Sequence, residues 1–104
     1  MTRDDIRHET DDKGGKFFIH EGGKHVAELS YSMAGKDLFV DHTYVAPEKR
    51  GGDIASSLVA AAVALARREG RMVIPACPYV KGIFDKTPAY ADVRRPPAKD
   101  DEED

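Results

Sequence analysis

The sequence predicts one α+β domain, in which an antiparallel meander of strands is joined to a β–α–β crossover with one long helix and a short C-terminal helix. Three segments in the first half have strand-like apolar patterns and are separated by turns that contain glycine. One long segment in the second half has helical periodicity, and a short apolar segment follows it. A strand, a helix and a strand with short links form a crossover, so the last strand is expected to pair parallel to the one before the helix.

The meander is predicted from alternation along the chain. In residues 25–33, the side chains of Ala27, Leu29, Tyr31 and Met33 fall on one face, which is expected to be buried. The next segment is apolar on both faces, and we therefore expect it at the centre of the sheet. Residues 21–24 and 34–36 supply the turns, and an edge strand is expected near the N-terminus. The predicted strands cover residues 6–10, 16–20, 25–33 and 37–45.

The long helix is predicted over residues 54–69. An apolar stripe follows its helical spacing, Asp53 stands at the N-cap position, and Gly70 is a typical C-terminal stop. A strand over 71–75 and a short helix over 80–86 follow. We expect the single domain to occupy residues 1–93. Residues 94–104 contain two adjacent prolines and an acidic run, and are expected to form a disordered tail.

Composition narrows the classes of protein to which the chain can belong. The net charge of −3 becomes +2 when the five acidic residues 100–104 are left aside, which is too weakly basic to indicate nucleic-acid binding. No stretch approaches the roughly 20 apolar residues of a membrane span, and no signal peptide is evident. The single cysteine cannot form an intramolecular disulfide, and the histidines lack metal-ligand spacing. We expect a cytoplasmic monomer without a nucleic-acid, membrane or metal partner.

The segment between the third strand and the long helix carries the strongest chemical signal. The first turn of a helix has unpaired N–H groups and the positive end of the helix dipole. Gly51 and Gly52 would let a bulky anion approach that backbone, as in phosphate sites, and Lys49 and Arg50 add positive charge. The alternative, which stays open, is an ordinary loop whose glycines only make the turn.

The same segment resembles the acetyl-CoA motif of the GNAT acetyltransferase superfamily, which runs Gln/Arg-x-x-Gly-x-Gly/Ala. Arg50 matches the first position and Ala55 the last, whereas Asp53 stands where the middle glycine belongs. The segments HTYV, PACPYV, FDKTPAY and ADV resemble the small single-domain subfamily that is similar to bacterial YjdJ and the animal NATD-type proteins. The resemblance covers residues 10–93 and implies a minimal GNAT fold, without the helices that larger members place over the acceptor substrate.

The resemblance also implies which residues bind acetyl-CoA. Backbone N–H groups would hold the CoA pyrophosphate, and the splayed end of the preceding strand would pair with the pantetheine arm. The Asp53 carboxylate could instead be an N-cap on the N–H of Ser56, and it would repel a pyrophosphate unless it turns aside. The implied pyrophosphate residues are Arg50, Gly51, Gly52, Asp53, Ile54 and Ala55, and the implied pantetheine residues are Thr43, Tyr44 and Val45.

Cys77 is the first catalytic candidate. In the subfamily that the chain resembles, a cysteine at this place faces the thioester. Cys77 would then be a nucleophile or would protonate the departing CoA thiolate, and the alternative is a small buried apolar residue. Larger GNAT enzymes often use a tyrosine as general acid. Its counterpart here is Phe84, which cannot donate a proton, so Cys77, Tyr79 or Tyr90 would have to fill that role.

His42 is the second catalytic candidate. The predicted alternation places it on one strand face with Leu38, Val40 and Tyr44. A neutral imidazole there could take a proton from an ammonium acceptor, directly or through water, and the alternative is a core histidine bound to backbone.

Two functions are therefore carried forward. One is an N-acetyltransferase that transfers an acetyl group from acetyl-CoA to an unidentified small-molecule or protein amine. The other is an acetyl-CoA-binding module with little or no catalysis, which the vacant tyrosine position and Asp53 favour.

Overall fold

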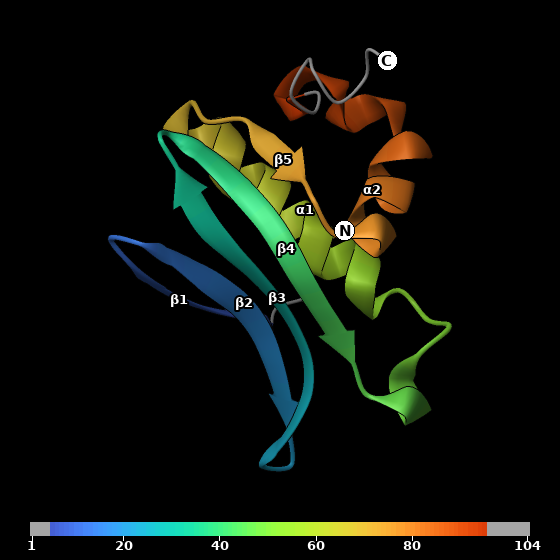
Figure 1. Ribbon diagram of the computed structural model, residues 1–104. Coiled ribbons are helices and arrows are strands. Elements are labelled where there is room, and N and C mark those ends of the chain that lie inside the picture. The colour runs from blue at the N-terminus through green and yellow to red at the C-terminus, as the bar shows by residue number, and fades with distance from the viewer. Residues whose placement is uncertain (1–4, 96–104) are drawn as a thin grey trace.

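The computed structural model describes residues 5–95, which form one five-stranded sheet with α1 along one face (Figure 1). The strands lie in the order β1-β2-β3-β4-β5, all antiparallel except the parallel pair β4 and β5. The predicted meander and crossover are confirmed. The strands are β1 (Arg7–Asp11), β2 (Gly14–Glu21), β3 (Lys24–Ala34), β4 (Asp37–Val45) and β5 (Val73–Pro75), and the helices are η1 (Pro47–Lys49), α1 (Ile54–Glu69), α2 (Pro78–Asp85) and η2 (Pro88–Val93).

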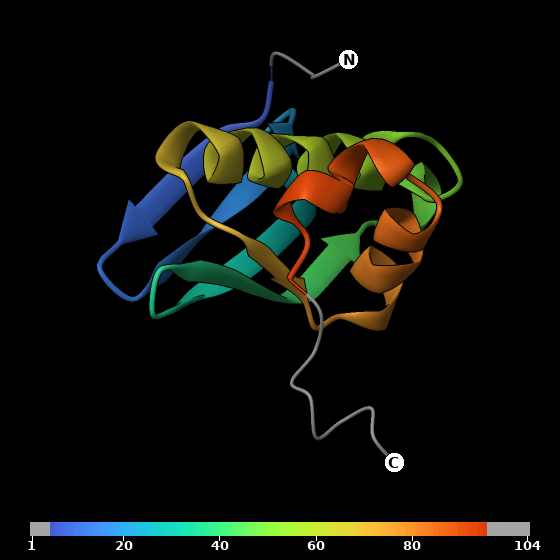
Figure 2. The same ribbon diagram turned by 90° about the horizontal axis from the view of Figure 1, so that it is seen from above.

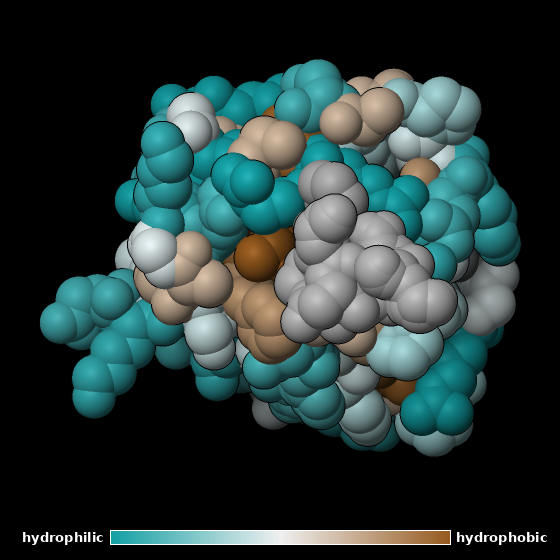
Figure 3. Space-filling model, turned by 45° about the horizontal axis from the view of Figure 1, so that its top comes forward, coloured by the Kyte–Doolittle hydropathy of each residue, from teal (hydrophilic) through white to brown (hydrophobic). Residues whose placement is uncertain are grey.

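The core lies between the sheet and α1, as the view from above shows (Figure 2). Helix α1 has the predicted bounds, and it ends at Gly70, whose φ of +67° is the left-handed conformation that glycine adopts without strain. Leu29, Leu38 and Leu58 are fully buried between the two layers. The face of the molecule in Figure 3 is mainly hydrophilic, with hydrophobic residues in small separate patches. No helix within residues 5–95 is long and apolar enough to span a bilayer.

A bulge in β4 changes which side chains face the core. Tyr31 of β3 pairs with Val40, but the preceding residue, Ser30, pairs with His42. Asp41 is therefore an extra residue without a partner in this ladder. Beyond the bulge, the residues of β4 that would have faced the core face the other side of the sheet, and the reverse holds for their neighbours. His42 therefore lies on the face opposite Leu38 and Val40, and the prediction that it shares their face is wrong. It does share a face with Tyr44.

The C-terminal segment contacts the domain beyond the predicted boundary. Arg94 forms a parallel bridge with Val73, and the N–H of Arg95 donates to the Val73 carbonyl at 2.9 Å. The Arg95 guanidinium also pairs with the carboxylate of the buried Asp37. The prediction of a disordered tail is therefore wrong for Arg94 and Arg95, and its remaining part, 96–104, lies outside the described residues.

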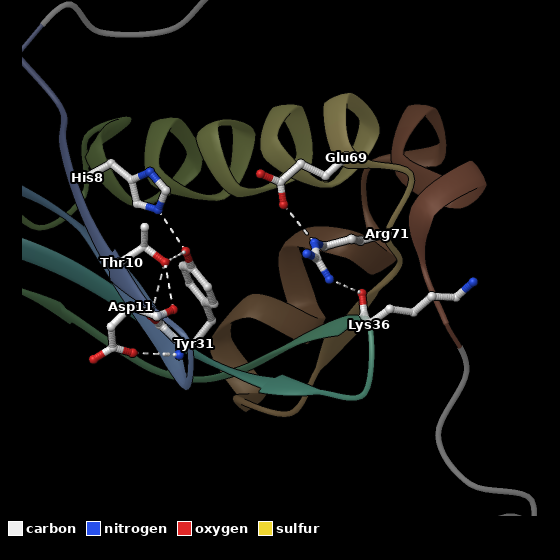
Figure 4. Close-up of polar contacts among 8 residues, drawn as sticks. His8, Thr10, Asp11, Tyr31, Lys36, Glu69 and Arg71 are labelled. Carbon is white, nitrogen blue, oxygen red and sulfur yellow. Dashed lines mark hydrogen bonds and ion pairs between the residues drawn. The ribbon is translucent and has the colours of Figure 1, made fainter.

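A polar cluster anchors the edge strand β1 near the C-terminal end of α1 (Figure 4). His8 Nε2 lies 2.7 Å from the Tyr31 hydroxyl, which donates to Thr10 Oγ1 at 3.3 Å. The imidazole also stacks on Phe17 with ring centroids 4.2 Å apart. Burial lowers the pKa of His8, the nearby Arg68 lowers it further, and Glu69 partly opposes both. The cluster thus holds β1 against the sheet with a histidine that favours its neutral form.

Candidate active site

The two parallel strands separate because β5 is short. The ladder between them ends where Val40 is opposite Pro75, after which the Ala76 and Cys77 N–H groups both donate to the Val40 carbonyl, at 2.9 and 3.0 Å. The chain then enters α2, whose Pro78 suits the first helical turn. The C-terminal half of β4, Asp41 to Val45, has no strand partner on that side among residues 5–95. An open edge of extended backbone remains.

The loop from β4 to α1 is held at its two ends. Arg50 Nε donates to the Val45 carbonyl at 2.8 Å, and the Lys49 ammonium lies 2.7 Å from a Glu21 carboxylate oxygen on the β2–β3 hairpin. Gly51 has a φ of +89°, a conformation that side-chain-bearing residues rarely adopt. The loop therefore reaches the start of α1 with glycine backbone exposed.

The N-terminus of α1 is free of a side-chain cap. Asp53 occupies the N-cap position as predicted, but its carboxylate makes no capping hydrogen bond, so the bond to the Ser56 N–H that was the alternative for this residue is absent. Only the Asp53 carbonyl is used, as acceptor for the Ser57 N–H at 2.9 Å. The first turn contains no acidic residue. Its N–H groups are therefore available to an anion at the positive end of the helix dipole.

Cys77 faces this open edge of β4 from the N-cap position of α2. Its sulfur lies 3.3 Å from the Thr43 hydroxyl. Burial raises the pKa of the Cys77 thiol, but the Thr43 hydroxyl lowers it by stabilising the thiolate. The backbone N–H groups of Val80, Tyr79 and Thr43 act in the same direction, and the net pKa lies below the ordinary value. A lowered pKa makes the thiolate, the nucleophilic form, more available.

A cavity of about 600 Å³ joins these three features. It extends from the loop before α1 along the end of β4 to the start of α2. Nine of the predicted site residues line it, together with Lys49 and Pro78, and Tyr79 is among them with 56% of its surface exposed. The lining residues are Thr43, Tyr44, Val45, Lys49, Arg50, Gly51, Gly52, Ala55, Cys77, Pro78 and Tyr79.

Three predicted site residues do not line the cavity. The Ile54 side chain is buried in the core, and Asp53 is exposed at the helix start. His42 lies across the sheet, with 58% of its side chain exposed. It therefore lies on the face opposite Thr43 and Cys77. The sequence indicated Lys49 only as a positive charge beside the loop. Pro78 was not among the predicted site residues, and it could have been found from its position beside Cys77. In the described part of the chain, no three potential metal ligands come together.

The site lies where two parallel strands diverge, and its elongated shape with exposed N–H groups at one end is suited to a long ligand that carries an anionic group. Residues 16–93 match the family of GCN5-related N-acetyltransferases. Because this match covers most of the chain, the protein belongs to that family, and its α+β fold is the GNAT fold. The finer assignment to the subfamily of YjdJ and NATD-type proteins stays a prediction.

Solved structures share the fold at low sequence identity. A GCN5-like candidate N-acetyltransferase from Staphylococcus aureus is 23% identical, covers 98% of this chain and 100% of its own, and has a TM-score of 0.70. Ribosomal-protein-alanine N-acetyltransferase from Brucella melitensis biovar Abortus 2308 is 18% identical over 73% of this chain and 62% of its own, with a TM-score of 0.59. The candidate N-acetyltransferase YhhK from E. coli, bound to coenzyme A, is 13% identical over 79% of this chain and 66% of its own, with a TM-score of 0.53. No curated protein matches the chain.

Proposed function

We propose that the protein is an acetyl-CoA-dependent N-acetyltransferase that acts on an amine. The observation that supports this most is the single cavity that joins an uncapped helix N-terminus, an open strand edge and a cysteine with a lowered pKa. Those three parts suit the phosphates, the pantetheine arm and the thioester of acetyl-CoA, in that order. Family membership and the coenzyme A bound to a protein of the same fold support the same ligand.

The binding roles follow from what each segment offers. The N–H groups at Gly51, Gly52 and the start of α1 face the phosphates, with Lys49 and Arg50 as nearby positive charges. The backbone edge from Thr43 to Val45 has no strand partner on this side, although the Val45 carbonyl already accepts from Arg50, and it can hydrogen-bond the amides of the pantetheine arm, as an added strand would. This order leaves the thioester beside the Cys77 sulfur.

Cys77 is best suited to carry the acetyl group. Its thiolate would attack the thioester carbonyl carbon, the bond from that carbon to the CoA sulfur would break, and CoA would leave as a thiolate. The acceptor amine would then attack the acetyl carbon on Cys77, the bond from that carbon to the Cys77 sulfur would break, the cysteine thiolate would leave with the electron pair, and the proton lost by the amine would pass to water. The lowered pKa favours this role over proton donation, which needs a protonated thiol. The Tyr79 hydroxyl can protonate the departing CoA sulfur.

The alternative is acetyl-CoA binding with little or no turnover. One observation favours it: Phe84 is buried in the core, so the position at which larger relatives are expected to hold a tyrosine supplies no acid. Under this alternative the cavity and its ligand are the same, and only the transfer step is missing.

Four measurements on the full chain test the proposal. Calorimetric titration with acetyl-CoA measures binding, with S-acetylpantetheine as the matched ligand that lacks the pyrophosphate. Amide chemical shifts on adding acetyl-CoA should centre on Gly51, Gly52, Asp53 and Ile54. Intact-protein mass after incubation detects an acetyl group, and acetylated products from a mixture of primary amines report transfer.

The outcomes separate the roles. An acetyl adduct that disappears in Cys77→Ser supports the carrier role, whereas transfer that persists in Cys77→Ser without an adduct indicates direct attack by the amine. Binding without adduct or transfer supports the alternative. If acetyl-CoA does not bind, or shifts centre away from the loop before α1, the proposed site is wrong.

A further inference from the structure

The face of the sheet opposite α1 carries a second group of aromatic side chains, separate from the core. Phe18 is 7% exposed but does not belong to the core cluster. The His20 and His25 rings cover it, with centroids 5.1 and 6.4 Å from its own. His25 stacks in turn on Tyr44 of β4, with centroids 6.0 Å apart and ring planes within 10°. Figures 1 and 2 show no helix over this face of β2 and β3.

A carboxylate lies at the centre of this face. Glu28 of β3 is opposite Tyr44 in the ladder, and 21% of its side chain is exposed. His25 Nε2 lies 3.1 Å from one carboxylate oxygen, and the Ser30 hydroxyl donates to the other at 2.8 Å. His42 Nε2 is 4.0 Å from that second oxygen. We call Phe18, His25, Glu28, His42 and Tyr44 the open-face cluster.

Within residues 5–95, Glu28 has only histidines as ion-pair partners and no lysine or arginine. Lys16 is a cation on the same face, and its ammonium lies 5.4 Å from the centre of the Phe18 ring. A carboxylate that is fixed in position but lacks a strong counter-ion is suited to receive the positive charge of a ligand. The exposed Tyr44 ring beside it offers a flat apolar surface, on which a cation or an aromatic group can stack.

The open-face cluster adjoins the acetyl-CoA cavity through Tyr44. Tyr44 stacks on His25 and also lines the cavity. Its neighbour Thr43 points to the other side of β4, where its hydroxyl meets the Cys77 sulfur. His42 and Tyr44 thus flank Thr43 on the open face, about 7 Å apart along the strand. Because β5 stops opposite Val40, the edge of β4 at this point is open to both faces.

We propose that the open-face cluster is the binding site of the acceptor, and that the acceptor is a primary ammonium compound with a flat apolar group and no carboxylate. The ammonium group first binds the Glu28 carboxylate while the flat group stacks on Tyr44, and the amine then has to cross the open edge of β4 to reach the acetyl group on Cys77, which lies on the other face. This inference rests on the proposed acetyl transfer and adds the acceptor class. Glu28 would repel the carboxylate of an amino acid. Asp41, which is exposed on β4 next to His42, would do the same.

The test uses 2-phenylethylamine as acceptor and L-phenylalanine as the matched compound with an added carboxylate. In the wild-type chain we expect 2-phenylethylamine to have the higher kcat/KM by at least about tenfold. Glu28→Gln should raise its KM by about tenfold, change kcat by less than about threefold, and reduce the preference over phenylalanine. Lys16→Gln, which removes the competing cation, should lower that KM. Asp12→Asn in the turn between β1 and β2 is the control and should change none of these values.

The affinity for acetyl-CoA, measured by calorimetry, separates this proposal from the one on which it rests. If Glu28→Gln still binds acetyl-CoA and transfers to 2-phenylethylamine with the wild-type KM and preference, the acceptor site is wrong and acetyl transfer stands. If the wild-type chain binds CoA but shows no turnover, 2-phenylethylamine is titrated into the CoA-saturated protein. Amide shifts at residues 25–30 and 42–44, lost in Glu28→Gln, support the site, and shifts elsewhere or none overturn it.

Discussion

The contact between Thr43 and Cys77 gives a prediction whose size can be worked out. Thr43→Val removes the hydroxyl that lies 3.3 Å from the cysteine sulfur and keeps the shape of the side chain. A hydrogen bond to a charged group contributes about 1.5–3 kcal/mol and one between neutral groups about 0.5–1.5 kcal/mol. The thiolate therefore loses about 1 kcal/mol more than the thiol does. We expect the pKa of Cys77 to rise and the thiolate fraction at pH 7 to fall about fivefold.

Alkylation by iodoacetamide measures this change, because the thiolate is the reacting form. The rate constant at pH 7 should fall about fivefold in Thr43→Val and should stay near the wild-type value in Thr43→Ser, which keeps the hydroxyl. A thermal unfolding curve for each variant shows that the fold is retained. Equal alkylation rates in wild type and Thr43→Val, with both folded, would refute the view that Thr43 controls this thiol.

Three further predictions concern charge and packing. Asp53→Gly should tighten acetyl-CoA binding, measured by calorimetry, by about two- to fivefold, because it removes an exposed, non-capping carboxylate from the helix N-terminus. Glycine at the N-cap lowers the stability of the fold by only a few tenths of a kcal/mol. Weaker binding would show that Asp53 assists the ligand. Burial lowers the pKa of His8 from 6.5, so as the pH falls the His8 imidazole binds a proton in the unfolded chain before it does so in the folded chain. The stabilisation present above pH 6.5 is therefore lost as the pH falls through the lowered pKa. Urea unfolding at pH 7.5 and 5.5 should show a smaller loss of stability in His8→Gln than in the wild type, and an equal loss contradicts the assignment. Leu58→Ala should cost about 2–5 kcal/mol in denaturant unfolding, because Leu58 is fully buried between α1 and the sheet, whereas a loss below 1 kcal/mol would mean that this core is loosely packed.

Features set by neighbours in sequence could be predicted. Helix α1 has the expected bounds because its stripe, Asp53 and Gly70 are all local signals. The strand over 37–45 also has its predicted bounds, and α2 starts two residues before the predicted helix because Pro78 fits the first turn.

Features set by pairing between distant segments could not be predicted. The bulge at Asp41 depends on how β3 and β4 align, and alternation along β4 alone gives no sign of it. His42 was therefore placed on the wrong face. Likewise, Arg95 lies in a polar, proline-rich stretch that is typical of disorder, but the buried Asp37 across the fold fixes it in place. The loop before α1 was found from sequence because glycines and a helix start are adjacent there.

The short length of β5 has a consequence for how the site can be studied and how it can change. What the cavity presents to its ligand is largely main chain: the uncovered margin of β4 and the first amides of α1. Main-chain groups are the same whatever side chain they carry. Substitutions that only shorten a side chain, such as Val45→Ala, would thus leave most of the recognition surface intact, and single-residue truncation scanning would understate its importance. Proline, which removes an N–H, or an ester in place of a peptide bond would reveal it. For the same reason, residues in this region can diverge widely between relatives while the surface that meets the ligand is preserved.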